Sequence, residues 1–451
     1  MRHKIIYILL SVVLLLTTAA SAQTLTLQQC REMAISSNRS HKSSGERILM
    51  AEDMLSAYKT YRLPDFSLKG SYLYASTSLS ASISGGYLPI ITSGVMSSDS
   101  FAYMPDQNYD LKIGSVWSGS AMATQPIYMG RKISNAIKLA SVGVKISTLD
   151  RQRSEAEVLQ QVDNAFYKIV ELEELLLTAQ RYESVVAELH KQMQSGYDVG
   201  MKTRNDLMKI SVRLSEAELQ TLRATNGVRL AKMNLCYAVG LPLSTEGLEI
   251  VNNDTDVTVI DESSLDITSR PEWAILNEQL EAKRLEAKIT RGDFRPSVVA
   301  VGAYGYTNGV TINGSKLINN ASFAGGVTIN VPIFHWGEGR RKSSAKEREI
   351  TIAQNQLEDM GQLMTLELMQ AINIYNESIL EVHHTENALQ QAEENMRMSK
   401  NQYNAGMETL TDYLESQALW QKAMSDLCTA KSQQRCAHTS YLKCRGALVV
   451  K

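Results

Sequence analysis

The sequence repeats itself once, over a distance of 206 residues. Residues 197–206 read YDVGMKTRND and residues 403–412 read YNAGMETLTD, so Tyr, Gly, Met, Thr and Asp recur in register. The same offset joins QPIY at 125–128 to VPIF at 331–334. The distance from the proline of the second motif to the tyrosine of the first is 71 positions in both copies. A period of this length indicates two copies of one domain rather than a solenoid of short repeats.

The first 22 residues have the pattern of a secretory signal peptide. A basic start is followed by an apolar stretch at 5–16 and by small residues at 20–22. Twelve apolar residues are fewer than the about 20 that a transmembrane helix needs. We therefore expect the mature chain to begin near Gln23. Gln28 and Gln29 stand where a lipoprotein signal would need small residues before Cys30, which argues against lipidation.

Composition excludes several classes of function. After residue 22 no run of 18 apolar residues occurs, so the sequence predicts no transmembrane helix. The formal net charge is −2 and no basic block is present, which argues against a nucleic-acid partner. Three of the five cysteines, Cys428, Cys436 and Cys444, are eight residues apart, a spacing that turns a helix by about 80° per step and does not converge on a metal. No nucleophile–base pair, phosphate loop or ligand cluster stands out, so we expect no enzyme, no cofactor and no metal.

Helical and strand-like patterns alternate along the chain. Residues 25–62 are typical of a helix, opened by a capping box at Thr26, whereas 64–126 are poor in charge and alternate with period two like a strand pair. Within that stretch, Gly, Pro and Ser at 76–108 indicate a long exposed loop. Helical periodicity then runs from about 131 to Gly240, and a polar stretch at 244–269 follows.

The second half repeats this plan. A capping box at Ser269 with Pro271 near the first turn predicts a helix to about residue 295. Alternating segments at 297–306 and 321–333 predict strands around a short Asn/Gly loop, followed by a long helix and by a further helix at about 409–445.

The helix lengths predict a tall helical wall. A helix of ~71 residues is about 107 Å long, and the helices at 25–62 (~57 Å) and 206–240 (~52 Å) together match that length. The natural packing places one long helix beside two shorter ones stacked end to end, as in a coiled coil.

The strands need partners from other chains. Four strands leave open edges, which natural proteins avoid. Their low charge, tyrosine content and alternation suit membrane strands of about 9–11 residues. Two chains would supply eight strands to a closed barrel and three chains would supply twelve.

Taken in order, these motifs resemble the TolC family of outer-membrane efflux proteins, also called outer membrane factors, over essentially the whole mature chain. The resemblance rests on the Leu25–Leu27 start, the Pro-Ile-aromatic strand exits, the Arg270-Pro271-Glu272 start of the second half, and above all the paired Tyr-x-x-Gly-x-x-Thr-x-x-Asp motif.

The resemblance implies a homotrimer in the outer membrane of a Gram-negative bacterium. Three chains form a twelve-stranded β-barrel in the lipid, continued by a long α-helical barrel through the periplasm. The pore is passive; a periplasmic adaptor (membrane fusion protein) meets its tips, and an inner-membrane transporter, proton-driven or ABC, supplies the energy. The implied domains are a signal peptide at 1–22, a first repeat at 23–243 with its β-hairpin at 64–126, an equatorial insert at 244–269, and a second repeat at 270–451 with its β-hairpin at 297–333.

The paired motif then marks the periplasmic tips. Gly200 and Gly406 are expected at the helix–helix turns, where glycine accepts positive φ, and Thr203 and Thr409 follow them. The resemblance assigns these turns to adaptor contact. An ordinary helix C-cap explains the glycines equally well.

Acidic residues near the tips are the candidate gate. Asp412 and Glu415 are three apart and share a helix face, and in the family acids at these places form the tunnel constriction. Tyr403 and Asp206 would join the network that holds neighbouring hairpins shut. A carboxylate in the first turn is also stabilised by the helix dipole alone, and a solvated acidic face is the alternative for Glu415.

Glu408 departs from the family pattern. The family member that we know best has an arginine here, which makes ionic links that keep the channel closed. A glutamate would repel an aspartate, so we expect a looser or differently latched closed state, with Lys202 or Arg204 as possible substitutes for the missing base.

Five aromatic residues of the strands fit a girdle at the membrane interface, although strand propensity alone also favours them. They are Tyr72, Tyr74, Trp117, Tyr304 and Tyr306.

Rival interpretations make different demands on the sequence. A periplasmic adaptor would show one helical hairpin flanked by lipoyl-like β segments, and a purely structural coiled-coil protein would leave the strands unexplained. Within the preferred interpretation, export of small molecules is favoured over the alternative, the outer-membrane channel of a type I protein secretion system. The sequence does not identify the cargo.

Overall fold

The computed structural model describes residues 23–92, 95–243, 248–251, 259–260 and 265–449. The predicted signal peptide and most of the predicted insert therefore lie outside the described residues. No helix in the described part of the chain combines the length and apolarity needed to cross a membrane.

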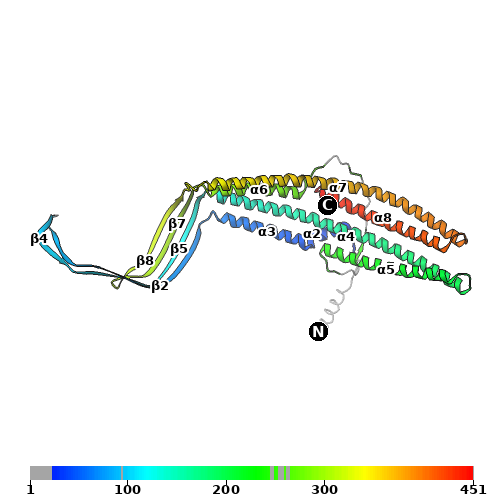
Figure 1. Ribbon diagram of the computed structural model, residues 1–451, viewed down its shortest axis with the longest axis horizontal. Helices are drawn as coiled ribbons and strands as arrows, with labels where there is room; N and C mark the ends of the chain where they lie inside the picture. The colour runs from blue at the N-terminus through cyan, green and yellow to red at the C-terminus, as the bar shows by residue number, and fades with distance from the viewer. Residues whose placement is uncertain (1–22, 93–94, 244–247, 252–258, 261–264, 450–451) are drawn as a thin grey trace, which may run out of the picture. The chain divides into compact units, whose positions relative to one another are not determined.

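The first half contains β1 (Gln23–Leu25), α2 (Leu27–Ser37), α3 (Arg39–Thr60), β2 (Asp65–Ile83), β3 (Gly86–Thr92), β4 (Val95–Met104), β5 (Gln107–Met129), α4 (Lys132–Asp198) and α5 (Arg204–Val239) (Figure 1). The second contains β6 (Leu248–Ile250), α6 (Pro271–Gly292), β7 (Ser297–Ile312), β8 (Ser315–Asn330), α7 (Glu338–Asn404) and α8 (Leu410–Cys444).

The backbone keeps the sequence offset of 206 residues. Helices α4 and α7 begin at Lys132 and Glu338, and both are 67 residues long. Each is preceded by two consecutive left-handed residues, at φ 62° and 68° for Gly130 and Arg131 and at 48° and 79° for Trp336 and Gly337. The same connection therefore leads from strand to helix in both halves.

The described chain divides into two compact units. The first comprises the residues up to Ala51, Gly143–Leu280 and the residues from Ile352 onward. Its main core lies among α2, α4 and α5, with Phe166, Ile169 and Leu235 almost completely buried. A second cluster joins α7 to α8 around Leu368, Ile372 and Tyr441.

Polar contacts tie the shorter helices of this unit to the long ones. On α4, Asp163 is fully buried and accepts two hydrogen bonds from the Arg31 guanidinium of α2, at 2.8 and 2.5 Å, and one from the Thr439 hydroxyl of α8 at 2.8 Å. Lys232 of α5 pairs with Glu173 of α4 at 2.8 Å. Helix α4 thus contacts first one short helix and then another, as the helix lengths predicted.

The described part of the insert is held at two points. Strand β6 pairs in parallel with β1, from Gln23 opposite Leu248 to Leu25 opposite Ile250. Further on, the Asn376 side chain of α7 accepts a hydrogen bond from the Ile260 backbone N–H at 3.2 Å and donates one to the Ile260 carbonyl at 3.1 Å.

The second unit comprises Glu52–Val142 and Glu281–Thr351. Four strands form an antiparallel sheet in the order β2-β5-β7-β8, so that the hairpins of the two halves meet where β5 pairs with β7. Asn313 and Gly314, at φ 49° and 77°, form the tight turn between β7 and β8. Asn-Gly suits such a turn because both positions need positive φ. Strands β2 and β8 are the sheet's edges in the described chain.

The prediction of a long loop over 76–108 is wrong. Strand β2 continues to Ile83, β5 begins at Gln107, and β3 and β4 pair with each other from Gly86 opposite Met104. Ser, Gly and Pro suggested a loop because their side chains carry little strand propensity. Backbone pairing between the two arms of the hairpin supplies the hydrogen bonds instead.

Helix boundaries differ from expectation at two further places. The predicted helix at 25–62 is broken at Asn38, whose extended backbone ends α2 and whose side-chain oxygen accepts a hydrogen bond from the Ser40 backbone N–H at 2.8 Å. The capping box at Thr26 is present. Helix α6 begins at Pro271, so Arg270 rather than Ser269 occupies the position before its first turn.

Candidate functional site

The two helical hairpins of the first unit end in the same tight turn. Gly200 and Gly406 lie at φ 78° and 74°. In the first turn the Met201 N–H donates to the Gly196 carbonyl at 2.8 Å, and in the second the Met407 N–H donates to the Gln402 carbonyl at 2.9 Å. These 6→1 bonds are those of a Schellman motif, which requires a left-handed residue at the glycine position.

Threonine opens the returning helix in both copies. The hydroxyl of Thr203 accepts a hydrogen bond from the Asp206 N–H at 3.1 Å, and that of Thr409 accepts one from the Asp412 N–H at 3.2 Å. The aspartate carboxylates accept hydrogen bonds from the same hydroxyls, at 2.7 and 2.6 Å. Both aspartates are therefore part of helix caps, in addition to any role in a gate.

The two tips meet at Tyr403 of α7, which also stacks on Tyr413 of its own hairpin. The Tyr403 ring stacks on Tyr413, with centroids 5.3 Å apart and planes 12° from parallel, and its hydroxyl donates to the Met193 sulfur at 3.9 Å. The Lys202 ammonium from the other hairpin lies 5.4 Å from the centroid of the Tyr403 ring, within cation–π range. Beneath them, the buried side chains of Val186, Leu189, Leu207, Ile210, Leu410 and Leu414 form a common apolar cluster.

The predicted gate acids lie on the surface of this cluster. Asp412 and Glu415 are exposed on α8, while Tyr413 and Leu414 between them are buried. Neither acid forms an ion pair within the described part of the chain. The helix therefore presents both carboxylates on its uncovered side.

Glu408 lies in the turn that follows Gly406. One of its carboxylate oxygens, Oε2, is buried and has no hydrogen-bond partner among the described residues. The two candidate bases do not compensate it within the chain, because neither Lys202 nor Arg204 forms an ion pair in the described structure. A buried carboxylate oxygen without a donor is costly, so this position would gain from a donor supplied by another molecule.

In the second unit, one face of the four-stranded sheet is apolar. Register places Tyr72 opposite Trp117, and Tyr304 opposite both Ala121 and Phe323. The Tyr306 ring approaches Trp117, with centroids 5.1 Å apart. All five predicted girdle residues therefore share this face, together with exposed Phe66, Leu68, Tyr74, Phe323, Val327 and Ile329.

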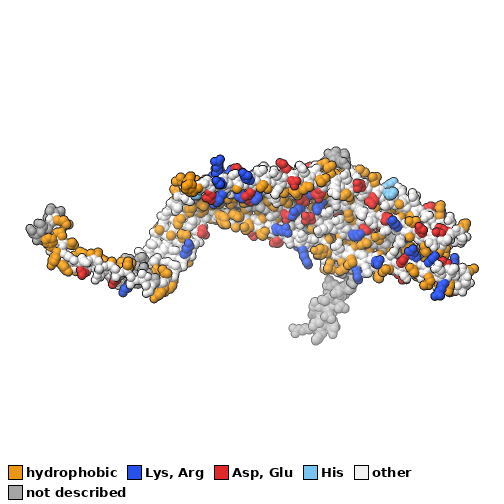
Figure 2. All heavy atoms as spheres, in the orientation of Figure 1, with side chains coloured by type: hydrophobic (Ala, Val, Ile, Leu, Met, Phe, Trp, Pro, Cys, Tyr) orange, Lys and Arg blue, Asp and Glu red, His pale blue; other side chains and the backbone are white. Residues whose placement is uncertain are grey.

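The opposite face of the sheet is mainly small and polar, with a few apolar side chains such as Leu73, Met122 and Val301. Lys69 pairs with Ser120, and Ser71 with Ser118, whose hydroxyls lie 2.8 Å apart. On the other side of β5, Ser118 faces Thr307. Hydrophobic side chains are frequent and charges few along the strands, whereas Lys, Arg, Asp and Glu cover the helices (Figure 2). Alternation between an apolar and a polar face is the pattern of a membrane barrel strand, with lipid outside and water inside.

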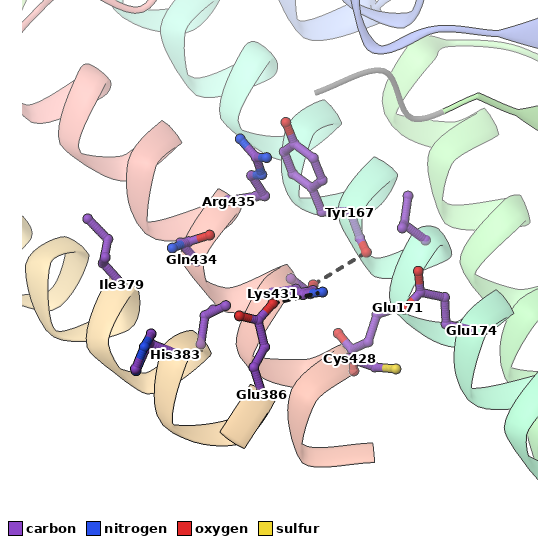
Figure 3. Close-up of a pocket in the computed structure, with 13 residues that line it drawn as sticks. Tyr167, Glu171, Glu174, Ile379, His383, Glu386, Cys428, Lys431, Gln434 and Arg435 are labelled. Atoms are coloured by element: carbon purple, nitrogen blue, oxygen red, sulfur yellow. Dashed lines mark hydrogen bonds and ion pairs between the residues drawn. The ribbon is translucent and has the colours of Figure 1, made fainter. Parts of the chain in front are cut away.

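A polar cavity of about 500 Å³ lies between α4, α7 and α8 in the first unit (Figure 3). Lys431 pairs with Glu386 across it at 3.3 Å, and the Ser432 hydroxyl donates to the Tyr167 carbonyl at 3.3 Å. Burial, reinforced by Glu174, raises the pKa of the Cys428 thiol in its wall to about 12. This thiol is therefore protonated at neutral pH and is a poor nucleophile.

The described residues contain neither a cluster that could bind a metal ion nor a cysteine with a lowered pKa. No group of three or more His, Cys, Asp or Glu side chains there is placed to hold a metal ion. Burial likewise raises the pKa of Cys30 and of Cys436 to about 11. Cys428 and Cys444 are buried, whereas Cys436 is partly exposed.

Sequence reasoning missed one surface feature. Phe334 and Trp336, in the connection between β8 and α7, are exposed and stack edge to face with centroids 4.9 Å apart. The sequence repeat could have revealed this feature, because Trp336 stands 206 residues after Gly130 and therefore at the equivalent position of the second copy. A tryptophan in the place of a turn glycine is an unusual choice and marks the position for attention.

Comparison with known proteins places the chain in a family. A family model described as "Outer membrane efflux protein" matches residues 33–241 and 267–440. No curated protein sequence gives a significant match.

Solved structures share the fold. The CmeC outer membrane channel of Campylobacter jejuni is similar with a TM-score of 0.75 and 18% identity, over 93% of this chain and 85% of that one. VceC of Vibrio cholerae gives 0.71 and 17%, over 93% and 96%. The open state of the Neisseria gonorrhoeae MtrE channel gives 0.68 and 14%, over 95% and 93%.

Proposed function

Because the chain belongs to the outer membrane efflux protein family, we propose that it is the passive outer-membrane exit channel of a tripartite efflux system. Small molecules reach it from an inner-membrane transporter through a periplasmic adaptor. The proposal includes an outer-membrane location in a Gram-negative bacterium and a periplasmic extension formed by the helices. It also includes the signal peptide at 1–22 and the division into repeats at 23–243 and 270–451.

The observation that carries the proposal is the four-stranded sheet. Its apolar aromatic face suits lipid and its Ser- and Thr-rich face suits water. The edge strands β2 and β8 leave backbone donors and acceptors for further pairing. A membrane sheet must close on itself, because lipid offers no hydrogen bonds to an open edge. Pairing of β8 with β2 of the next chain closes such a barrel, and three chains give twelve strands.

The periplasmic gate is assigned to the tips. In a trimer, exposed Asp412 and Glu415 would form two rings of three carboxylates, and such rings attract cations and repel anions. Opening would separate the hairpins at the Lys202–Tyr403 and Met193–Tyr403 contacts, like an iris. Asp206 is proposed to belong to the same closing network. The turns at Gly200 and Gly406, with Thr203 and Thr409, are the proposed adaptor contacts.

Single-channel conductance of the detergent-purified protein in a planar bilayer tests the proposal. The wild type is expected to give a small, cation-selective conductance, and Asp412→Ala/Glu415→Ala is expected to raise it and weaken the selectivity. Equal conductance and selectivity in both proteins would leave the pore proposal intact but would show that these two acids do not form the gate. Failure of the wild type to insert would overturn the channel itself.

A further inference from the structure

A cavity of about 450 Å³ lies between α4, α6 and α7 in the first unit. Two guanidinium groups line it, those of Arg153 on α4 and of Arg270 directly before α6. Much of the remaining wall is apolar and consists of Ile275, Leu276, Met360, Leu363 and Met364. Small-molecule sites have volumes of about 300–1,000 Å³, so the cavity is large enough for a ligand.

Arg270 presents a buried hydrogen-bond donor to this cavity. Its side chain is only 6% exposed, and its Nη1 donates to the Glu367 carboxylate at 2.8 Å. Its Nε has no hydrogen-bond acceptor among the described residues, since the Glu272 carboxylate, at 3.5 Å, is not aligned to accept. A buried N–H without an acceptor is unfavourable, so this donor favours a ligand that brings one.

Arg153 presents a second donor of the same kind. Its Nη2 pairs with Asp150 at 2.6 Å, which holds the guanidinium in place. Its Nε is buried and has no hydrogen-bond partner in the described part of the chain, because the Glu157 carboxylate is 3.8 Å away. Two unsatisfied Nε–H groups therefore line one cavity, and the two lone pairs of a single carbonyl oxygen can accept from both.

The charges around the cavity favour an uncharged ligand. Arg153 and Arg270 are balanced by two acids in the same lining, Glu272 and Glu367. An anion would meet these carboxylates as well as the guanidinium groups, and a cation would leave both Nε–H donors without an acceptor. An uncharged molecule with a carbonyl oxygen satisfies the donors, and its hydrocarbon part fits the apolar wall.

The cavity lies on the side of α7 that faces away from the insert. The side chain of Asn376 holds the insert through two hydrogen bonds to Ile260. Glu367, which lines the cavity, stands nine residues before Asn376, and nine residues make about two and a half turns of an α-helix. The two side chains therefore leave α7 in opposite directions. In the proposed channel the insert is equatorial and outside the helical barrel, so the opposite face borders the tunnel.

We propose that this cavity is a substrate-binding site in the wall of the export tunnel, and that it takes uncharged amphipathic molecules by a carbonyl oxygen. The oxygen accepts from the Nε–H groups of Arg270 and Arg153, and the hydrocarbon part lies along Met360 and Met364. The position in the tunnel rests on the proposed function, to which the inference adds a substrate class. A site with two hydrogen bonds and an open apolar wall binds weakly enough for the molecule to leave, as conduction requires.

Photocrosslinking of the full-length protein in lipid nanodiscs locates the ligand. The probe is octanamide with a diazirine on its chain, and the matched probes are the corresponding octanoate and octylammonium. The carboxamide is expected to label the segment 360–367 saturably and at lower concentration than either charged probe. Tighter binding of a charged probe would overturn the uncharged class. Absence of saturable labelling would overturn the site and would fit a cavity filled by a neighbouring chain.

A pair of tryptophan variants tests whether the probe lies in the cavity. Met360 and Met369 are 38% and 42% exposed, and nine residues between them place them on opposite faces of α7. Met360→Trp fills the cavity and is expected to abolish saturable labelling by the carboxamide. Met369→Trp, which adds the same bulk on the side of the insert, is expected to bind as wild type does. Equal labelling of the two variants would show that the probe binds elsewhere.

Arg153→Met tests the donor without removing the buried Arg270–Glu367 pair. Loss of one hydrogen bond is expected to lower the affinity for the carboxamide about fivefold. Arg181→Met, which removes an exposed arginine from the same helix, is the matched control and is expected to bind normally. An unchanged affinity for the carboxamide, with a lower affinity for octanoate, would show that Arg153 acts only by its charge and would overturn the assignment.

Conductance of the same protein in a planar bilayer separates this inference from the channel. A protein that conducts but shows no saturable labelling keeps the channel and loses the binding site. A protein that is labelled in the cavity but does not conduct loses the channel, and with it the place of the site in a tunnel wall. Conductance together with saturable labelling that Met360→Trp abolishes would support both.

Discussion

Thr409 and Asp412 cap each other at the first turn of α8. The Asp412 N–H donates to the Thr409 hydroxyl at 3.2 Å, and the Asp412 carboxylate accepts from the Thr409 hydroxyl at 2.6 Å and from its backbone N–H at 3.3 Å. The same carboxylate is exposed, next to Glu415 one turn later. One side chain thus serves the stability of the tip and the charge of the proposed gate, and the two roles can be separated by mutation.

Thr409→Ala removes the cap without removing the charge. We expect a loss of about 1 kcal/mol in the stability of the tip, since an N-cap threonine contributes that much. Cation selectivity should be unchanged. Asp412→Asn should show the reverse, with a smaller loss of stability and weaker selectivity in reversal-potential measurements. Loss of selectivity in Thr409→Ala would show that the carboxylate acts only through the cap.

Glu408→Arg tests the latch at the second tip. The buried, unpartnered Oε2 predicts that the glutamate destabilises the closed tip. An arginine there would reach exposed carboxylates such as Asp206 of another hairpin and favour closure. We expect a lower single-channel conductance than wild type, and Glu408→Gln, which only removes the charge, should lie between the two. An unchanged conductance in both variants would rule out a role of this position in closure.

The buried Arg31–Asp163 pair should dominate the stability of the first unit. Asp163 is fully buried and also accepts from Thr439. Asp163→Ala removes the buried carboxylate from beside the largely buried guanidinium, for an expected loss of about 3–5 kcal/mol. Arg47→Gln, which breaks the exposed pair with Asp150, should cost less than about 1 kcal/mol. Thermal unfolding in detergent, followed by circular dichroism, compares the two variants; similar losses would contradict the ranking.

His41 should make stability depend on pH. Burial, and then the Arg151 guanidinium, lower the pKa of this imidazole below its ordinary value, while Glu155 acts weakly in the opposite direction. The neutral ring accepts from Arg151 at 3.5 Å. Because the folded state disfavours the charged form, the stabilisation is complete above about pH 6.5 and is lost as the pH falls below that value.

The measurement for His41 is the apparent unfolding midpoint between pH 7.5 and 5.5. Wild type should lose more stability over this interval than His41→Gln, which does not titrate. Parallel curves for the two proteins would assign the pH dependence to other groups.

Two glycines should respond to alanine in opposite directions. Gly45 lies within α3 with open space around its Cβ position, so Gly45→Ala should stabilise the protein by about 1 kcal/mol. Gly240 is at φ 85°, and a Cβ there would lie 2.8 Å from the Ser37 backbone. Gly240→Ala should therefore destabilise by at least about 1–2 kcal/mol. The pair is measured side by side by thermal unfolding, and a gain in both would mean that the turn relaxes.

Sequence analysis predicted the parts of the fold that depend on local chemistry. The offset of 206 residues placed both tip glycines, Thr26 placed the first cap, and Gly240 ended α5. It failed where side-chain preference and backbone pairing disagree, as in the serine-containing strands β2 and β4. It also missed the helix break at Asn38, whose side chain forms a local turn with Ser40 that periodicity does not reveal.

The candidate site was less accessible to prediction. Residue types alone suggested Asp206 and Asp412, but not that each carboxylate returns to a threonine hydroxyl. The common face of Tyr72, Trp117 and Tyr306 depends on strand register, which is set by long-range pairing of β5 with β7. The partial burial of Glu408 depends on the turn geometry and on the packing around it.

The open edges β2 and β8 also have a genetic consequence. In the proposed trimer every chain pairs its β8 with β2 of a neighbour, so one chain that lacks β8 leaves the whole barrel open at that junction. In a cell that makes equal amounts of intact and damaged chains, only about one trimer in eight would be fully intact. An allele that destroys β8 but leaves the helical hairpins folded should therefore be dominant-negative, and a single defective gene copy should sensitise cells that still carry a good one.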